Sequence, residues 1–242
     1  MKNPVPENRR KMMSAESPLA GIPEFHTEDA LLSWMEEEIR LIHALPISNP
    51  DAVEIFSFTG SDLCHANPPS AARILAQFTL ALLLADWACY DAQADREDYS
   101  HLQQAVTVFP GGFRLWMAQL DGNCIPIGYS GFHPIARDTF YRLKTAPESI
   151  TNRKQITPEP ASNSGQDYYY IYSVGIIKQF HRSTASRRLV KEFSNDLALA
   201  QKCALAAIVV SPEGKRIIER FGLQQSGCIT HDGHKEIAYV SE

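Results

Sequence analysis

The stretch Tyr168–Val190, YYYIYSVGIIKQFHRSTASRRLV, decides how this chain folds. Residues 168–177 are rich in aromatic and β-branched side chains, which predicts a strand. An apolar stripe with spacings of three and four residues begins at Leu189, which predicts a helix. Residues 181–186 lie between them and are small or basic. A helix that begins directly after a strand presents unpaired N–H groups and partial positive charge, so we expect a phosphate-binding turn here.

Composition indicates one large soluble domain with an extension. The chain has 242 residues, 44% of them hydrophobic, 21% charged, and a net charge of −5. The acidic balance disfavours a nucleic-acid partner, since such proteins usually carry a basic surface. The five cysteines are scattered and form no CxxC pair. We therefore expect reduced thiols, no metal site and a cytoplasmic protein.

No membrane span or secretion signal is expected from the apolar segments. The longest apolar run, Ile74–Tyr90, is interrupted by Gln77 and Asp86 and is too short to cross a bilayer comfortably. We interpret it as a buried helix. The basic start of the chain is followed by no apolar segment of signal-peptide length, so residues 1–25 are expected to form a flexible tail.

Turn and capping signals divide the rest of the chain into elements. Asp121-Gly122 between two apolar runs is the clearest hairpin signal in the sequence. The predicted order is a helix at 27–44, a strand at 53–59, helices at 70–92 and 95–109, a hairpin at 113–133, the strand and helix of the opening stretch, a strand at 204–210, a helix at 212–221 and a strand pair at 223–240. We assign 1–48 to a tail and amphipathic helix, and 49–242 to one domain with a polar insertion loop at 136–167.

This order of elements resembles the GNAT superfamily of acyl-CoA-dependent N-acetyltransferases. Three passages carry the resemblance: the hairpin 115–131, the strand-to-helix turn after Ser173, and the strand and helix 204–223 that end in Phe-Gly-Leu. The resemblance implies an α+β fold in α/β/α layers, with a mixed, mostly antiparallel central sheet and flanking helices. It also implies acetyl-CoA, or another acyl-CoA, as the co-substrate.

The cofactor turn of the family reads Arg or Gln, two residues, Gly, one residue, Gly or Ala. His181 falls on the first position, Thr184 on the first glycine and Ser186 on the second, so the register is kept while the letters differ. The resemblance implies cofactor contacts from Ile176, Ile177, His181, Arg182, Ser183, Thr184, Ala185, Ser186 and Arg187. Basic residues at a helix start are disfavoured unless an anion is bound. The alternative is a solvated basic helix start.

The resemblance also indicates where catalytic groups should lie. The family's tyrosine acid, on its last helix, corresponds here to Ile218, which cannot donate a proton. The family's base on the strand before the turn corresponds to Tyr170 and Tyr172. A phenol is a poor base at neutral pH, but it can orient a water or donate to a thiolate. The alternative is that these tyrosines only pack on a half-buried strand.

These features lead to one principal functional hypothesis. We expect an acyltransferase that moves an acetyl or other acyl group from acyl-CoA to a primary amine, by direct attack in a ternary complex. The amine is carried by a small molecule or a protein, and the chain is a monomer or a dimer. One alternative is a catalytically impaired GNAT-fold module that binds CoA or a partner protein for regulation. Another is a transferase of longer acyl chains, suggested by the very apolar helix Ala71–Tyr90.

Overall fold

A single twisted sheet organises the protein. The computed structural model describes residues 18–19, 21–66, 68–90, 96–160, 168–198, 203–231 and 234–242. Seven strands lie in the order β1-β2-β3-β4-β5-β7-β6. Their bounds are β1 Glu54–Thr59, β2 Phe113–Leu120, β3 Asn123–Pro134, β4 Tyr168–Ile176, β5 Ala204–Val209, β6 Gln224–His231 and β7 His234–Val240.

One parallel pair interrupts an otherwise antiparallel sheet. β4 and β5 run parallel, and all other neighbouring strands pair antiparallel. A parallel pair needs a crossover connection, which the helix α7 (Thr184–Leu197) supplies. The predicted mixed, mostly antiparallel sheet is therefore confirmed, and the strands follow one another along the chain as predicted.

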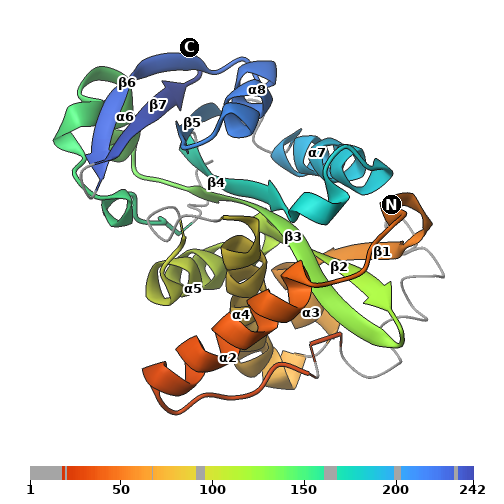
Figure 1. Ribbon diagram of the computed structural model, residues 1–242. Helices are drawn as coiled ribbons and strands as arrows, with labels where there is room; N and C mark the ends of the chain where they lie inside the picture. Colours follow the sequence, from red (N-terminus) through yellow and green to blue (C-terminus); the bar gives the residue numbers. More distant parts are fainter. Residues whose placement is uncertain are drawn as a thin grey trace, which may run out of the picture.

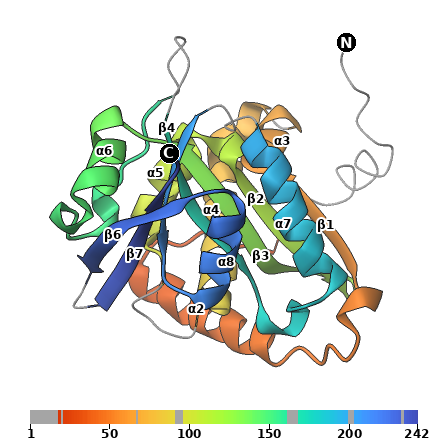
Figure 2. The same ribbon diagram turned by 90° about the horizontal axis from the view of Figure 1, so that it is seen from above.

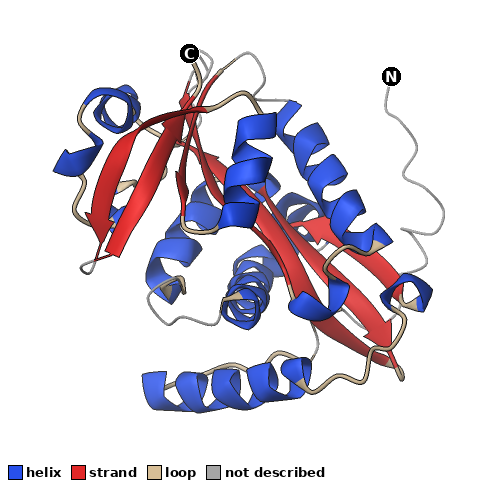
Figure 3. Cartoon of the chain, turned by 45° about the horizontal axis from the view of Figure 1, so that its top comes forward, coloured by secondary structure: helices blue, strands red, loops and turns tan. Residues whose placement is uncertain are grey.

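Helices cover both faces of the sheet (Figure 1). One face carries α2 (Glu28–His43), α4 (Ala71–Cys89) and α5 (Tyr99–Val108), and the other carries α7 and α8 (Pro212–Arg220). Two shorter helices lie among the described residues: α3 (Gly60–Ala66), which packs on α4, and α6 (Arg137–Thr145), which packs beside β6 and β7. Seen from above in Figure 2, α7 and α8 lie across the strands, while Figure 3 separates the helical layers from the sheet.

Local sequence signals set most of the element ends. The Thr27 side chain accepts the N–H of Ala30 at the start of α2, and the Ser211 side chain accepts that of Gly214 at the start of α8. The hairpin turn has Asp121 at φ 48° and Gly122 at φ 83°, the left-handed pair that a two-residue turn requires. The helix ends expected from these caps are confirmed.

One helix was not predicted, and two expectations about segments outside the predicted elements were wrong. Residues 60–66 form α3, whose first turn is fixed by Asp62, because its carboxylate accepts the N–H and the hydroxyl of Thr59. The polar stretch 136–167 contains the helix α6, whose apolar side is only Phe140 and Leu143 and was too narrow to stand out. Residues 1–25 are not wholly a tail, since the Leu19 side chain is 0% exposed; residues 1–17 and 20 lie outside the described residues.

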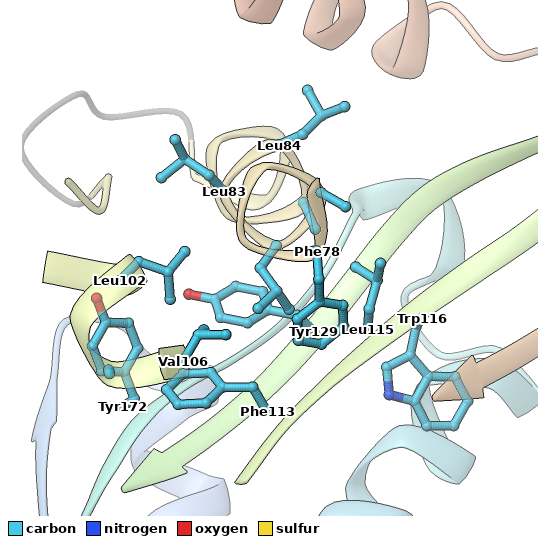
Figure 4. Packing of buried hydrophobic residues seen from close by; sticks show 14 of the residues in the cluster. Phe78, Leu83, Leu84, Leu102, Val106, Phe113, Leu115, Trp116, Tyr129 and Tyr172 are labelled. Atoms are coloured by element: carbon cyan, nitrogen blue, oxygen red, sulfur yellow. The ribbon is translucent and has the colours of Figure 1, made fainter. Parts of the chain in front are cut away.

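The apolar helix α4 lies against the sheet at the centre of the core (Figure 4). Phe78 of α4 is buried beside Leu115 and Tyr129 of the sheet, and Leu83 is buried on the side of α4 that faces Leu102 of α5. α4 and the turn before it, Pro68–Cys89, are long and apolar enough to cross a membrane by length and composition, but 56% of that apolar window is buried inside the protein. The interpretation as a core helix is therefore confirmed.

A buried ion pair fastens α7 to the sheet. Arg114 on β2 donates to both carboxylate oxygens of Asp196 on α7, at 2.7 and 2.8 Å. The two side chains are only 10% and 20% exposed. Such a bidentate pair fixes orientation as well as distance, and breaking it leaves a buried guanidinium.

We expect Asp196→Ala to lower the free energy of unfolding by about 3 kcal/mol, because Arg114 would keep its charge without its main partner. Urea unfolding followed by circular dichroism measures this value. Glu37→Ala is the matched control, since it removes an equally short pair with Arg40 that lies on the surface. An Asp196→Ala protein as stable as the control would contradict the assignment.

Candidate active site

The sheet opens between its two parallel strands. β4 pairs with β5 only over Tyr168–Ile171 and Ala204–Ala207, and the strands part beyond these residues. A cavity of about 60 Å³ lies at the opening, between β4 residues 172–174, β5 residues 207–209 and the helix α8. This space is large enough to admit water. Ile218, at the position of the family's tyrosine acid, lines it.

The open edge of β4 presents backbone groups to this opening. Ile177 donates its N–H to the carbonyl of Ile127 on the β3 side at 2.8 Å. Since successive residues of a strand turn their backbone groups to opposite sides, Tyr172, Val174 and Ile176 turn theirs toward the opening. Ile176 and Ile177 were expected to meet the pantetheine arm. Only the backbone groups of Ile176 face the opening, because the N–H of Ile177 bonds within the sheet. Val174 takes the place of Ile177 at the opening.

The predicted cofactor turn forms, but its groups are already bonded within the chain. His181 Nε2 lies 2.9 Å from the carbonyl oxygen of Ile176. Ser183 is the N-cap of α7, and its hydroxyl accepts the N–H of Ser186. The Arg187 guanidinium donates to Thr184 Oγ1 at 3.0 Å. Arg182 has φ 61° and turns the chain into the helix, while Ala185 is buried beneath its first turn.

An anion does lie at the start of α7, and it belongs to the protein. The Asp51 carboxylate, in a short 3₁₀ helix (Pro50–Ala52) before β1, accepts the N–H of Thr184 at 2.6 Å. The hydrogen bonds from Thr184 and the charge of Arg187 lower the pKa of Asp51. The basic helix start thus has a partner that sequence reasoning did not identify, because Asp51 and Thr184 are far apart in the chain.

A cluster of buried polar side chains surrounds Tyr172 of β4, on the face of the sheet that carries α4 and α5. The Tyr172 hydroxyl donates to the Glu97 carboxylate at 2.6 Å, and His101 Nδ1 lies 3.4 Å from the same oxygen. Arg153 pairs with Glu97 at 3.8 Å and with Glu236 at 3.6 Å. Burial alone raises the pKa of Glu97, but His101, Arg153 and Tyr172 outweigh it and hold that pKa below its usual range. Glu97 is therefore an ionised carboxylate.

A second carboxylate, Asp86 on α4, holds Glu97 in place. Asp86 accepts the backbone N–H of Glu97 at 2.8 Å and the hydroxyl of Tyr129 at 2.6 Å. Trp87 Nε1 donates to the carbonyl of Glu97 at 2.9 Å, so both backbone groups of Glu97 are anchored on α4. Burial and the nearby charge of Glu97 raise the pKa of Asp86 to about 7. Asp86 therefore changes protonation near neutral pH.

The two predicted tyrosines lie in this cluster with different surroundings. Burial and the charge of Glu97 raise the pKa of Tyr172, and burial raises that of Tyr170. Neither phenol can accept a proton as a base. Tyr172 orients Glu97 instead, while Tyr170 lines the cavity at the strand opening, where the charge of Arg153 acts on it.

Sequence reasoning missed the charged members of the cluster. Asp86, Glu97, His101 and Arg153 come from α4, the segment before α5, α5 itself and the polar insertion. One signal was present: Asp86 is a carboxylate inside an otherwise apolar buried helix, and such a group needs partners. The other residues carry no signal, since their meeting depends on tertiary packing.

Glu97 and Arg153 stand between two cavities. Both line the small cavity at the strand opening, and both line a second, open groove of about 1070 Å³ between α2, α4 and the start of α5. Among the described residues, no group of three or more His, Cys, Asp or Glu side chains is placed to hold a metal ion. The arrangement thus offers an ionised carboxylate that is reachable from two sides.

Comparisons with known proteins add a likeness of architecture. The sequence matches no family model and no curated protein. Solved structures do match: the GNAT-like decarboxylase GphF in complex with isobutyryl-CoA (12% identity, TM-score 0.48, 78% of this chain and 98% of that one) and the loading GNAT-like domain of CurA from Lyngbya majuscula (11%, 0.48, 78% and 97%). The NatC complex bound to Gag peptide and CoA matches at 10% identity and a TM-score of 0.49, over 78% of this chain and 98% of that one.

At such identities the roles of residues follow from this chain's own geometry. These matches, at 10–12% identity and TM-scores below 0.5, are a likeness of fold alone, so membership in the GNAT superfamily stays a prediction. The individual cofactor and catalytic residues remain predictions.

We expect the stability of the protein to fall as the pH rises from about 4 to about 7 because of Asp86. Its pKa of about 7 in the folded state lies above the value of about 3.9 for a free side chain, so the native state binds the extra proton between these pH values. Asp86→Asn removes this pH-dependent loss of stability. The free energy of unfolding of the variant should therefore exceed that of the wild type by a margin that grows with pH, up to a few kcal/mol at about pH 7. Asp138→Asn, on the exposed side of α6, is the control. Its free energy of unfolding, measured with urea at each pH, should change with pH in parallel with that of the wild type. Parallel curves for Asp86→Asn would contradict the assignment.

Proposed function

We propose that this protein transfers an acyl group from acyl-CoA to a primary amine by direct attack in a ternary complex. One observation carries the proposal: Glu97 and Arg153 line both the opening between β4 and β5 and the groove beside α2 and α4. Two reactants that enter from opposite sides meet at one carboxylate. This arrangement supports direct transfer, for which both must be held together.

Glu97 is the proposed general base. An amine must lose a proton to form an amide, and an ionised carboxylate within reach can accept it. Tyr172 and His101 orient the carboxylate by hydrogen bonds, and Asp86 fixes the backbone that carries it. Glu97 thus takes the role of base, which the resemblance assigned to the strand positions of Tyr170 and Tyr172.

Tyr170 is the proposed proton donor. Acyl-CoA supplies an activated thioester, whose C–S bond breaks as the C–N bond forms, and the departing sulfur needs a proton. Tyr170 lines the cavity at the strand opening, and its raised pKa keeps it protonated. Ile218 on α8 lines the same cavity and cannot serve.

The co-substrate would lie along the open edge of β4 and end at the α7 turn. Val174 and Ile176 offer backbone groups to the pantetheine arm, and residues 181–187 offer N–H groups and cations to the phosphates. Two contacts must yield: His181 leaves the Ile176 carbonyl, and Asp51 leaves Thr184. Both lie at the surface, where such bonds are weak. The free thiols of all five cysteines agree with the proposed cytoplasmic location.

Isothermal titration with acetyl-CoA and with CoA tests the proposal. We expect binding of both, and weaker binding to a His181→Ala/Arg182→Ala double variant, because the turn loses its cations. Absence of binding at millimolar cofactor would overturn the proposal.

We expect Glu97→Gln to lower the rate of acyl transfer by roughly 10²-fold or more, since the base is lost. The affinity for CoA should stay unchanged, because the cofactor contacts lie at the α7 turn. Glu213→Gln, on the exposed face of α8, is the control and should keep full activity. Transfer is followed by thiol release. A Glu97→Gln protein that stays within a few-fold of the wild-type rate would show that Glu97 is not the base.

We expect Asp51→Asn to tighten the binding of CoA by up to roughly fivefold. The amide still accepts the N–H of Thr184, but the negative charge that opposes a phosphate is gone. Pantetheine, which carries no phosphate, is the control ligand and should bind both proteins equally. Unchanged or weaker CoA binding in the variant would place the phosphates elsewhere.

A further inference from the structure

The groove beside Glu97 is long and leads out of the protein. It follows α4 from Arg73 to Trp87, a run of about 21 Å at 1.5 Å per residue. Its opposite wall is the first half of α2 and the segment Pro23–Thr27 before it. Glu97 and Arg153 line it near the end of α4 that carries Trp87, whose Nε1 donates to the Glu97 carbonyl; this end is called the inner end. An acceptor with a body much longer than its reacting amine would fill this shape.

Apolar side chains form the middle of the groove. α4 contributes Leu80, Leu83 and Trp87, and α2 contributes Leu31 and Leu32. Leu32 is 37% exposed, one of the few large apolar side chains in the described residues that remain open to water. Burial of an apolar ligand here would remove this surface from solvent, so the body of the ligand should be apolar.

Charges of both signs gather at the inner end. Glu97 pairs with Arg153, and Asp98 pairs with Lys154 at 3.1 Å. Arg96 has no ion pair with a described residue: its guanidinium lies 5.4 Å from the centre of the Trp87 ring, and its Nε donates to the Tyr90 carbonyl. A ligand carboxylate would satisfy Arg96 while an ammonium approaches Glu97.

We propose that the acceptor is an α-amino acid with an extended apolar side chain. This inference rests on the proposed function, since Glu97 must receive the amine. The α-ammonium meets Glu97, the α-carboxylate meets Arg96, and the side chain runs outward between Leu83 and Leu32. A plain alkylamine would leave Arg96 unused, and so would a polyamine, which carries no carboxylate.

Binding by the wild-type protein alone, without an acyl donor, tests this inference. Calorimetry compares 2-aminooctanoate with norleucine, which is two methylenes shorter, and with heptylamine, which lacks the carboxylate. We expect 2-aminooctanoate to bind tightest, with a loss of up to roughly fourfold per methylene removed. Arg96→Gln should weaken 2-aminooctanoate roughly tenfold and leave heptylamine unchanged.

Two exposed leucines of α2 provide a matched pair of variants. Leu32→Asn lies in the groove and should weaken 2-aminooctanoate, whereas Leu41→Asn, 46% exposed and outside the groove, should not. Equal affinities for the three ligands, equal effects of the two variants, or no binding of any ligand would overturn the inference. Failure to bind CoA would instead count against the proposed function, because these titrations contain none.

Discussion

A carboxylate in the middle of the core is the constraint on which the site depends. Asp86 lies on the most buried helix of the protein and bonds to Tyr129 of β3 and to the backbone of Glu97. A buried carboxylate without such partners would be costly, so helix, sheet and the segment before α5 are held in one relative position. That position places Glu97 beside Tyr172. The packing of the core and the geometry of the polar cluster therefore depend on the same contacts of Asp86.

The parallel pair of strands provides the second requirement. β4 and β5 part after four residue pairs and leave the last residues of β4 with an open edge. The edge would be a liability on the surface, but here α7 and α8 cover it from one side and the polar cluster closes it from the other. The opening between β4 and β5 is therefore enclosed by neighbouring parts of the protein.

Periodicity and capping residues predicted the strands, their order along the chain and most helix ends, because these signals are local. The hairpin at Asp121-Gly122 and the cap at Ser211 needed no knowledge of the fold. The reactive cluster could not be predicted in this way, since Glu97 and Arg153 carry no local pattern and meet only after folding. Tyr172 was identified by its strand position, but its role depends on the carboxylate that it touches.

The contact between Asp51 and Thr184 has a consequence for which ions the α7 turn admits. A ligand that binds there exchanges places with a carboxylate of the protein and does not enter an unused site. A singly charged anion, such as chloride or acetate, gains little from the exchange, because it carries the same charge as the carboxylate that it displaces. An anion with several charges on neighbouring oxygens gains from Arg182 and Arg187 as well. A turn that binds the proposed co-substrate would therefore discriminate by the number of charges on the anion, with Asp51 as the competitor that sets the threshold.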